Sequence, residues 1–518
     1  MNVHTQMILI LDFGSQTTQL IARRIREQKV YCEIHPYSTT LDRIKELNPS
    51  GIVLSGGPCS VYDDDAPLSD PALMSLGIPI LGICYGAQLM ILQHGGVVEK
   101  AEKREFGKAE LHVQFTEGLF AGLETGDDVH HHQVWMSHGD RVEVIPEGFE
   151  ATAVSDHSPF AALRHRDKPL VAVQFHPEVV HTLIGTDVLR NFIFGICECR
   201  PDWTMHSFIE TTVTAVREMV GSQKVICALS GGVDSSVTAA MVHRAVGNQL
   251  TCIYVNNGLM RTGESRSILR FFKEKSKLNV IDVDATRFFL SELDGIVDPE
   301  IKRRKIGLGF IKIFEEQASK LGDVKYLAQG TLYPDVIESV SFRGEAPIKS
   351  HHNVGGLPDV MKLDLIEPLR ELFKDEVREL GLELGLPEEA IHRQPFPGPG
   401  LGIRIMGEIT EERLDIIRQA DVIVLDEMKK NGWYRKVWQS FAVLLPVQTV
   451  GVMGDGRTYE NVIAIRCVDS RDAMTADWSK VPYDILGIIS TRIINEVRGV
   501  NRVVYDISSK PPATIEWE

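Results

Sequence analysis

Cys84 lies in the stretch Gly82-Ile-Cys-Tyr-Gly86, directly after an apolar run at residues 78–81. Small residues beside a nucleophile permit the strained strand-to-helix turn that exposes its side chain. The N-terminus of the following helix would favour the thiolate, and it would direct the backbone N–H of Tyr85 toward a developing oxyanion. The stretch therefore predicts covalent catalysis by a cysteine.

A base for this thiol is offered by His176, at the end of the apolar run 171–175. Glu178 follows closely, where its carboxylate could orient the imidazole and favour its cation. A second oxyanion donor is expected from Gly57, in the stretch Ser55-Gly-Gly-Pro58. Cysteine is commonly buried as a small hydrophobe, and most His-x-Glu pairs have no catalytic role. The prediction of a catalytic triad therefore depends on these residues occurring together.

A second candidate functional segment, residues 230–236, follows the apolar run 224–229 and begins a helical pattern. Glycines let the backbone approach an anion closely, while helix N–H groups and hydroxyls supply donors. A Walker A loop is excluded because Gly-Lys-Ser or Gly-Lys-Thr occurs nowhere in the chain. A turn that merely caps a helix is the alternative. The expected phosphate-binding residues are Ser230, Gly231, Gly232, Val233, Asp234, Ser235 and Ser236.

Carboxylates and cations further along the chain are candidates to bind Mg²⁺ or to contact the phosphates. Asp335 and Glu338 follow a β-rich run and, together with Asp234, are expected to bind Mg²⁺ against phosphate oxygens. Lys374 lies in a helical pattern from which it could reach a phosphate, although an exposed pair on the helix surface is the alternative. Residues 349–356 combine lysine, histidine and glycine, as expected of a mobile lid.

The elements that must position these residues alternate between β-rich apolar runs and helical patterns. This rhythm predicts α/β architecture with two open, largely parallel sheets. Pattern breaks at 198–203 and 394–402 predict three domains, 1–200, 203–393 and 394–518, the last of them a smaller α+β domain. The expected strands of the first two domains are 8–12, 51–54, 78–82, 170–175, 225–229, 251–255, 280–283 and 325–329. In the third domain, we expect helices near 410–431 and 483–498 and strands near 437–445, 461–468 and 502–507.

Charge and composition exclude several classes of protein. A formal net charge of -16 argues against non-specific binding of nucleic acid, which needs a basic surface. No apolar run approaches the ~18 residues of a membrane span, and the run 7–11 is too short for a signal peptide. The eight cysteines contain no Cys-x-x-Cys pair, so neither a zinc ribbon nor a disulfide framework is expected. We therefore expect a cytoplasmic protein.

Two further charged or histidine-rich stretches are not expected to form sites. Residues His130-His-His132 lack metal-ligand spacing and acidic company, so they are interpreted as a loop. Residues 302–305, Lys-Arg-Arg-Lys, are interpreted as a solvated helix face rather than as a binding patch.

The stretches Gly82-Ile-Cys-Tyr-Gly-Ala-Gln88 and Gln174-Phe-His-Pro-Glu178 resemble the nucleophile and His/Glu motifs of class I, triad-type glutamine amidotransferases. The resemblance extends over about residues 12–194. It implies that Cys84 attacks the side-chain amide of glutamine, that His176 moves the proton and that the carboxylate two residues later holds the imidazole. It further implies that the backbone at Gly57 and Tyr85 stabilises the oxyanion, and that ammonia and glutamate are the products.

The 230–236 loop resembles the Ser-Gly-Gly-x-Asp-Ser pyrophosphate loop of N-type ATP pyrophosphatases, which cleave ATP between its α and β phosphates. Residues 395–401, 452–460 and 510–518 extend the resemblance over essentially the whole chain, to the glutamine-hydrolysing GMP synthase family. That resemblance implies glutamine, ATP and XMP as substrates, amination of XMP to GMP, and a homodimer formed by the third domain. It also implies that XMP contacts Arg404, Lys510 and Glu516, although these could equally be surface residues.

Three alternatives remain at this point. An asparagine synthetase would need a nucleophilic cysteine at its N-terminus, whereas the second residue is Asn2. NAD synthetase shares the pyrophosphate loop but usually carries a nitrilase-type domain without this order of Cys, His and Glu. A nucleotide sensor built on an inactive amidotransferase is disfavoured because all three residues of the triad are present.

Overall fold

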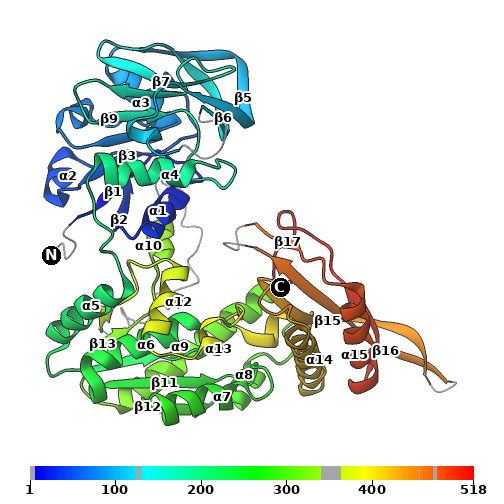
Figure 1. Ribbon diagram of the computed structural model, residues 1–518. Helices are drawn as coiled ribbons and strands as arrows, with labels where there is room; N and C mark the ends of the chain where they lie inside the picture. Colours follow the sequence, from blue (N-terminus) through cyan, green and yellow to red (C-terminus); the bar gives the residue numbers. More distant parts are fainter. Residues whose placement is uncertain (1–5, 124–129, 340–362, 454–455, 471–474) are drawn as a thin grey trace. The chain divides into compact units, whose positions relative to one another are not determined.

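The computed structural model describes residues 6–123, 130–339, 363–453, 456–470 and 475–518. Contacts divide the chain into two compact units (Figure 1). The first unit comprises mainly residues 1–211, and the second unit comprises mainly residues 212–336 and 349–518. No described helix has both the length and the apolar character needed to span a membrane.

The first unit contains a nine-stranded sheet with the order β2-β1-β3-β4-β9-β8-β7-β5-β6. The strands from β2 to β9 in this order are parallel, and the remaining strands pair antiparallel. The parallel strands are β1 (Ile8–Asp12), β2 (Cys32–Pro36), β3 (Gly51–Leu54), β4 (Ile80–Ile83) and β9 (Leu170–Val173). The antiparallel strands are β5 (Val97–Val113), β6 (His131–Val144), β7 (Phe149–Ser155) and β8 (Ala162–His165).

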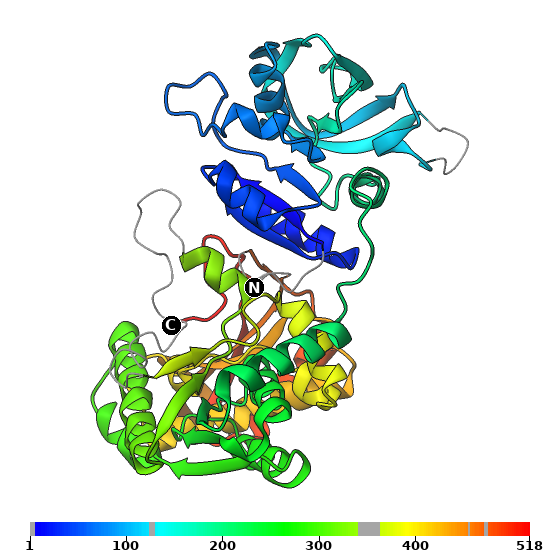
Figure 2. The same cartoon turned by 90° about the vertical axis from the view of Figure 1, so that its left-hand side faces the viewer.

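The two halves of this sheet differ in how well their sequence predicts them. Strands β3, β4 and β9 are buried along their whole length, so they appear in the sequence as continuous apolar runs. The long strands β5 and β6 (cyan in Figure 2) were not expected, because many of their residues are polar and face solvent on one side. The interpretation of residues 130–132 as a loop is corrected in part, since His131 begins β6.

Helices of the first unit connect these strands. They are α1 (Thr18–Glu27), α2 (Leu41–Leu47), α3 (Tyr85–Gln93) and α4 (Gly185–Arg190), with short turns η1 (Pro71–Ser75), η2 (Gly118–Phe120) and η3 (Asn191–Ile196). Helix α3 is buried from Tyr85 to Ile91, which fits a helix that is apolar on all sides. Helix α5 (Met205–Val220) begins in this unit and ends in the second.

The second unit is built on a fully parallel sheet with the order β12-β11-β10-β13-β14. The strands are β10 (Lys224–Ala228), β11 (Leu250–Asn256), β12 (Asn279–Asp284), β13 (Val324–Ala328) and β14 (Asp364–Ile366). The connecting helices are α6 (Val233–Val246), α7 (Glu264–Arg270), α8 (Thr286–Glu292), α9 (Pro299–Lys320), α10 (Tyr333–Ser339), α12 (Lys374–Glu383) and α13 (Glu388–Ile391). Strand order reverses beside β10, and ligands of such sheets bind at the carboxyl ends of the strands near this reversal.

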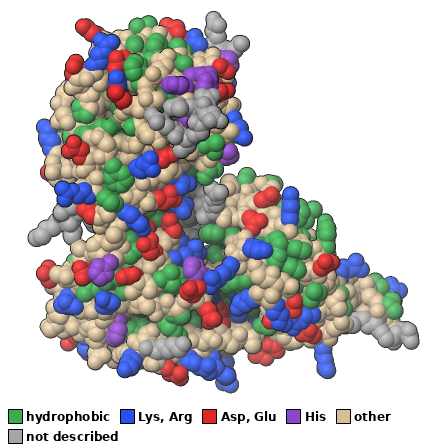
Figure 3. All heavy atoms as spheres, viewed as in Figure 1, with side chains coloured by type: hydrophobic (Ala, Val, Ile, Leu, Met, Phe, Trp, Pro, Cys, Tyr) green, Lys and Arg blue, Asp and Glu red, His purple; other side chains and the backbone are tan. Residues whose placement is uncertain are grey.

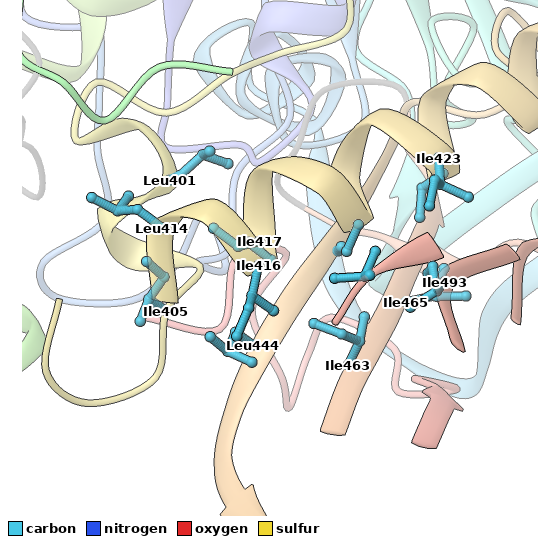
Figure 4. Packing of buried hydrophobic residues seen from close by; sticks show 14 of the residues in the cluster. Leu401, Ile405, Leu414, Ile416, Ile417, Ile423, Leu444, Ile463, Ile465 and Ile493 are labelled. Atoms are coloured by element: carbon cyan, nitrogen blue, oxygen red, sulfur yellow. The ribbon is translucent and has the colours of Figure 1, made fainter. Parts of the chain in front are cut away.

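The C-terminal part of the second unit carries a smaller, mostly antiparallel sheet. It consists of β15 (Gln439–Met453), β16 (Gly456–Asp469), β17 (Asp477–Trp478) and β18 (Val500–Tyr505), with helices α14 (Glu411–Lys430) and α15 (Tyr483–Glu496). Figure 4 shows Ile416 and Ile417 of α14 against Leu444 of β15 and Ile463 of β16.

The expected fold class is confirmed, with parallel-rich α/β sheets followed by a smaller α+β part. The two boundaries between the three expected domains stay predictions. One hydrophobic core contains Leu259 and Phe289 as well as Ile417 and Ile463, so residues on both sides of the expected boundary at 394 pack together.

Candidate active sites

Cys84 occupies the sharp turn between β4 and α3. Its φ of 51° and ψ of -105° are uncommon for a residue with a side chain, and such strain is typical of a nucleophile presented at a helix N-terminus. Glycines on either side make the turn possible. A Cβ on Gly86 would lie 2.4 Å from the carbonyl oxygen of Leu54, and one on Gly82 would lie 2.8 Å from Cα of Ala87.

Substitution of Gly86 tests whether this close approach holds the turn. We expect Gly86→Ala to destabilise the protein by about 1–3 kcal/mol, because the added methyl group meets backbone that has no room to move. Thermal unfolding should show a lower Tm, and the glutamine hydrolysis expected at this turn should fall with it. Gly195→Ala is the matched control, since its Cβ would meet nothing within 4 Å. An unchanged Tm for Gly86→Ala would contradict this account of the turn.

His176 and Glu178 lie beside the thiol. Nδ1 of His176 is 2.7 Å from Oε1 of Glu178, and both side chains are buried. Burial lowers the pKa of His176, but hydrogen bonds to Cys84 and Glu178 outweigh burial and raise this pKa to about 10. The imidazole is therefore a cation at neutral pH, which suits a thiolate–imidazolium pair.

The raised pKa of His176 predicts a pH dependence. The imidazolium persists as pH rises until about 10, where loss of its proton would end the expected hydrolysis of glutamine. In Glu178→Gln, the pKa of His176 should fall, so the alkaline limb of kcat/KM should move to lower pH by at least about one unit. The rate should also fall about 10²–10⁴-fold, as for other triads with an altered third residue. Glu46→Gln, at an exposed ion pair with Arg43, should leave the profile unchanged, whereas equal profiles for all three proteins would refute the role of Glu178.

The two expected oxyanion donors lie close to each other. A Cβ on Gly57 would be 3.2 Å from Cγ of Tyr85 and 2.9 Å from the carbonyl oxygen of Phe13. Neither backbone N–H donates to a protein acceptor in the described part of the chain. Both N–H groups are thus free to bind a ligand oxygen, and their role as an oxyanion hole stays a prediction.

Several side chains around the triad were missed by sequence reasoning. Nε2 of Gln174 lies 3.7 Å from Sγ of Cys84, and Oε1 of Gln174 accepts from Gln88 at 3.2 Å. The hydroxyl of Thr17 donates to Oε1 of Glu178 at 2.7 Å. Both glutamines stand within the quoted motifs, so their position could have suggested them. Thr17 is distant in the sequence, and no local pattern indicates its contact.

The expected phosphate-binding loop, residues 230–236, lies between β10 and α6, at the carboxyl edge of the parallel sheet. Gly231 has a φ of 78°, and a Cβ there would lie 2.3 Å from Cδ1 of Ile268. The hydroxyls of Ser230 and Ser235 are 2.9 Å apart, and that of Ser236 donates to the carbonyl of Gly232 at 2.6 Å. Gly232 is the N-cap of α6, so the loop presents the N-terminus of a helix, where anions bind favourably.

Two cations border this loop. Lys374, the first residue of α12, forms an ion pair with the carboxylate of Asp234. Arg393, which sequence reasoning missed, donates to the carbonyl of Gly231 at 3.0 Å and pairs with Glu264. Burial lowers the pKa of Arg393 to about 10, so the side chain remains a cation at neutral pH. The structure thus brings Lys374 to the loop, although its contact there is a carboxylate.

The remaining residues expected at the phosphate site are only partly described. Oδ2 of Asp335 accepts from the backbone N–H of Leu332 at 3.0 Å, at the start of α10. Glu338 lies on the same helix, but its side chain is outside the described residues. The expected lid at 349–356 also lies outside the described residues.

The expected XMP contacts lie near the C-terminus. Arg404 is fully buried, and its Nε and Nη2 lie 3.1 and 2.9 Å from the two carboxylate oxygens of Glu516. Lys510 joins Ala476 by backbone hydrogen bonds. Arg466, which sequence reasoning missed, is also fully buried and donates to the carbonyls of Ser508, Thr514 and Ile515. Buried guanidinium groups therefore hold this segment in place.

Comparisons with known proteins match segments of both units. Residues 9–196 match the family model "Glutamine amidotransferase class-I", residues 223–270 match "tRNA methyl transferase HUP domain" and residues 426–517 match "GMP synthase C terminal domain". Fold and site thus define a class I glutamine amidotransferase joined to a nucleotide-binding α/β unit.

Relatives over the full length are more specific. The chain is 75% identical to "GMP synthase [glutamine-hydrolyzing]" of Desulfotalea psychrophila, with 100% of each chain covered. It is 60% identical to the proteins of that name from Heliobacterium modesticaldum, covering 99% of each chain, and from Maridesulfovibrio salexigens, covering 99% of this chain and 100% of that one. The chain belongs to the glutamine-hydrolysing GMP synthase family.

Proposed function

We propose that this chain is a ligase that converts XMP to GMP with ATP and glutamine. It hydrolyses glutamine to glutamate and ammonia at one site, adenylylates XMP at the C2 oxygen at the other, and forms a C–N bond as ammonia displaces AMP. The observation that carries the proposal is the full-length similarity to relatives named for this activity, 75% identical over the entire chain. Both sites on one chain support it, because the thiol site can supply the nitrogen that the phosphate site consumes.

At the first site, the Cys84 thiolate attacks the carboxamide carbon of glutamine. The resulting oxyanion accepts hydrogen bonds from the N–H groups of Gly57 and Tyr85, and His176 gives its proton to the departing ammonia. Water then hydrolyses the thioester to glutamate and regenerates the thiol. Glu178 holds the imidazole through the 2.7 Å hydrogen bond to Nδ1, which leaves Nε2 for this proton transfer.

At the second site, the loop 230–236 binds the phosphates of ATP. The C2 oxygen of XMP attacks the α-phosphorus, a P–O bond forms, and pyrophosphate leaves. Ammonia then attacks C2, and AMP leaves with the oxygen. The helix N-terminus at Gly232 and the cations Lys374 and Arg393 lie where they can stabilise the charge of the departing pyrophosphate.

Mg²⁺ fits the carboxylates that border the loop. The Asp234 carboxylate pairs with the Lys374 cation, and only Oδ2 of Asp335 accepts a described hydrogen bond. Each side chain therefore has carboxylate oxygen that can bind a hard cation. We propose that Asp234 and Asp335, together with Glu338, bind Mg²⁺, which when bound neutralises pyrophosphate charge.

For XMP, we propose contacts from Lys510 and Glu516, with Arg404 contributing by positioning the Glu516 carboxylate rather than through an exposed group. We also propose a homodimer through the C-terminal sheet. Its strands carry exposed apolar side chains, notably Val452 at 78% and Tyr459 at 57% exposure. A cytoplasmic location is proposed because all eight cysteines are free thiols, as in a reducing compartment.

Product analysis tests the reaction directly. The purified chain should form GMP, AMP and pyrophosphate from XMP, ATP and glutamine. Deamido-NAD or aspartate in place of XMP should give no AMP, which separates this activity from the NAD and asparagine synthetases. Formation of ADP and phosphate, with XMP unchanged, would refute the proposal.

A further inference from the structure

Three side chains of the first unit have the composition of a transition-metal site. Glu110 and His112 lie on β5, and His131 lies directly opposite His112 on the antiparallel neighbour β6. Alternate residues of a strand point to the same face, so all three side chains share one face of the sheet. Their potential ligand atoms all lie within 4.8 Å of one another.

The detailed geometry suits an ion held at the surface. Nδ1 of His131 is 2.7 Å from Oε1 of Glu110, and the rings of His112 and His131 meet edge to face with centroids 4.2 Å apart. Ligand atoms at ~2.0–2.2 Å from a tetrahedral ion stand roughly 3.5 Å apart, so small side-chain rotations would bring all three onto one ion. The imidazole of His112 has no hydrogen-bond partner among the described residues, so its ring nitrogens are available.

Access to this cluster is open. The side chains of Glu110 and His131 are 58% and 40% exposed, and Figure 3 shows histidine side chains gathered over the region of β5 and β6. An ion could therefore enter from solvent and keep water in its remaining coordination positions. Sequence reasoning excluded a metal at residues 130–132 for lack of acidic company. The acidic partner is Glu110, which only the pairing of β5 with β6 brings alongside.

We propose that Glu110, His112 and His131 bind one divalent transition-metal ion, of the class of Zn²⁺ or Co²⁺. Imidazole ligands favour these ions over Mg²⁺ and Ca²⁺, so the site is distinct from any magnesium at the phosphate loop. The ion ties β6, the edge strand of the nine-stranded sheet, to β5. The same strand supports the triad, because the carbonyl of Trp135 accepts from the backbone N–H of His176 at 3.0 Å. An ion that binds the folded chain and not the unfolded chain would therefore stabilise the first unit.

Cobalt titration of the full-length protein tests this site. Co²⁺ should bind with visible d–d bands and without a thiolate charge-transfer band. The double variant His112→Gln/His131→Gln should raise the Kd for Co²⁺ at least about tenfold. His132→Gln is the matched control, because residue 132 points to the opposite face of β6. The Kd of this variant for Co²⁺ should equal that of the unsubstituted protein.

A second measurement guards against misfolding of the double variant. Zn²⁺ should raise the Tm of the original chain and of His132→Gln, but not that of Glu110→Gln, which removes one ligand from an exposed position. Equal Co²⁺ affinity in the original chain and the double variant would overturn the proposal. Absence of binding, or bands that show thiolate ligation, would overturn it as well.

Discussion

Cys84→Ala should lose synthesis of GMP from glutamine while keeping synthesis from ammonium. In the proposed mechanism the Cys84 thiol forms the covalent bond to glutamine, and loss of a triad nucleophile lowers the rate about 10⁴-fold or more. The parallel sheet with the proposed phosphate-binding loop belongs to the second unit and contains no group that this substitution changes. GMP formation should be measured with each nitrogen donor at saturating XMP and ATP.

The control for this experiment is Cys199→Ala, which removes another buried thiol of the first unit. It should retain both activities. If Cys84→Ala also loses the ammonium-driven reaction, the proposed division of labour between the two sites is wrong.

Asp234→Asn should strongly slow GMP formation from both nitrogen donors. The substitution removes the charge that pairs with Lys374 and a proposed oxygen ligand for Mg²⁺, in the loop proposed to bind the phosphates of ATP. We expect a fall of about 10²–10³-fold, as when one group that stabilises transition-state charge is removed. Pyrophosphate release with ammonium as the donor isolates this step from glutamine hydrolysis.

A matched Asp→Asn change in the same unit is Asp298→Asn. Asp298 is the N-cap of α9 and accepts from the N–H of Ile301 at 2.9 Å. Asparagine caps helices about as well as aspartate, so this variant should keep full activity. Ammonium-driven synthesis by Asp234→Asn at a rate near that of Asp298→Asn would show that the Asp234 carboxylate is dispensable.

Much of the fold could be predicted because parallel strands are buried on both faces. Strands β1 and β3 have the expected bounds, and the buried strands of the second unit begin and end within a few residues of expectation. The antiparallel strands β5 and β6 escaped prediction, since their solvent-facing residues interrupt the apolar pattern. The shared core across residue 394 was missed for another reason, because packing between distant segments leaves no local signal.

The turn at Cys84 and the loop at 230–236 could be predicted from the sequence, because each depends on a few neighbouring residues. The turn at Cys84 needs its flanking glycines, and the loop at 230–236 needs glycine and hydroxyls before a helix. Contacts between residues distant in the sequence could not be predicted in this way. One such contact joins Arg393 to the carbonyl of Gly231, and another joins Glu110 to His131. Both depend on the tertiary arrangement of the chain or on strand register, which local sequence does not specify. Long-range pairing is set by how buried surfaces fit together, so these partners emerge only once the chain is folded.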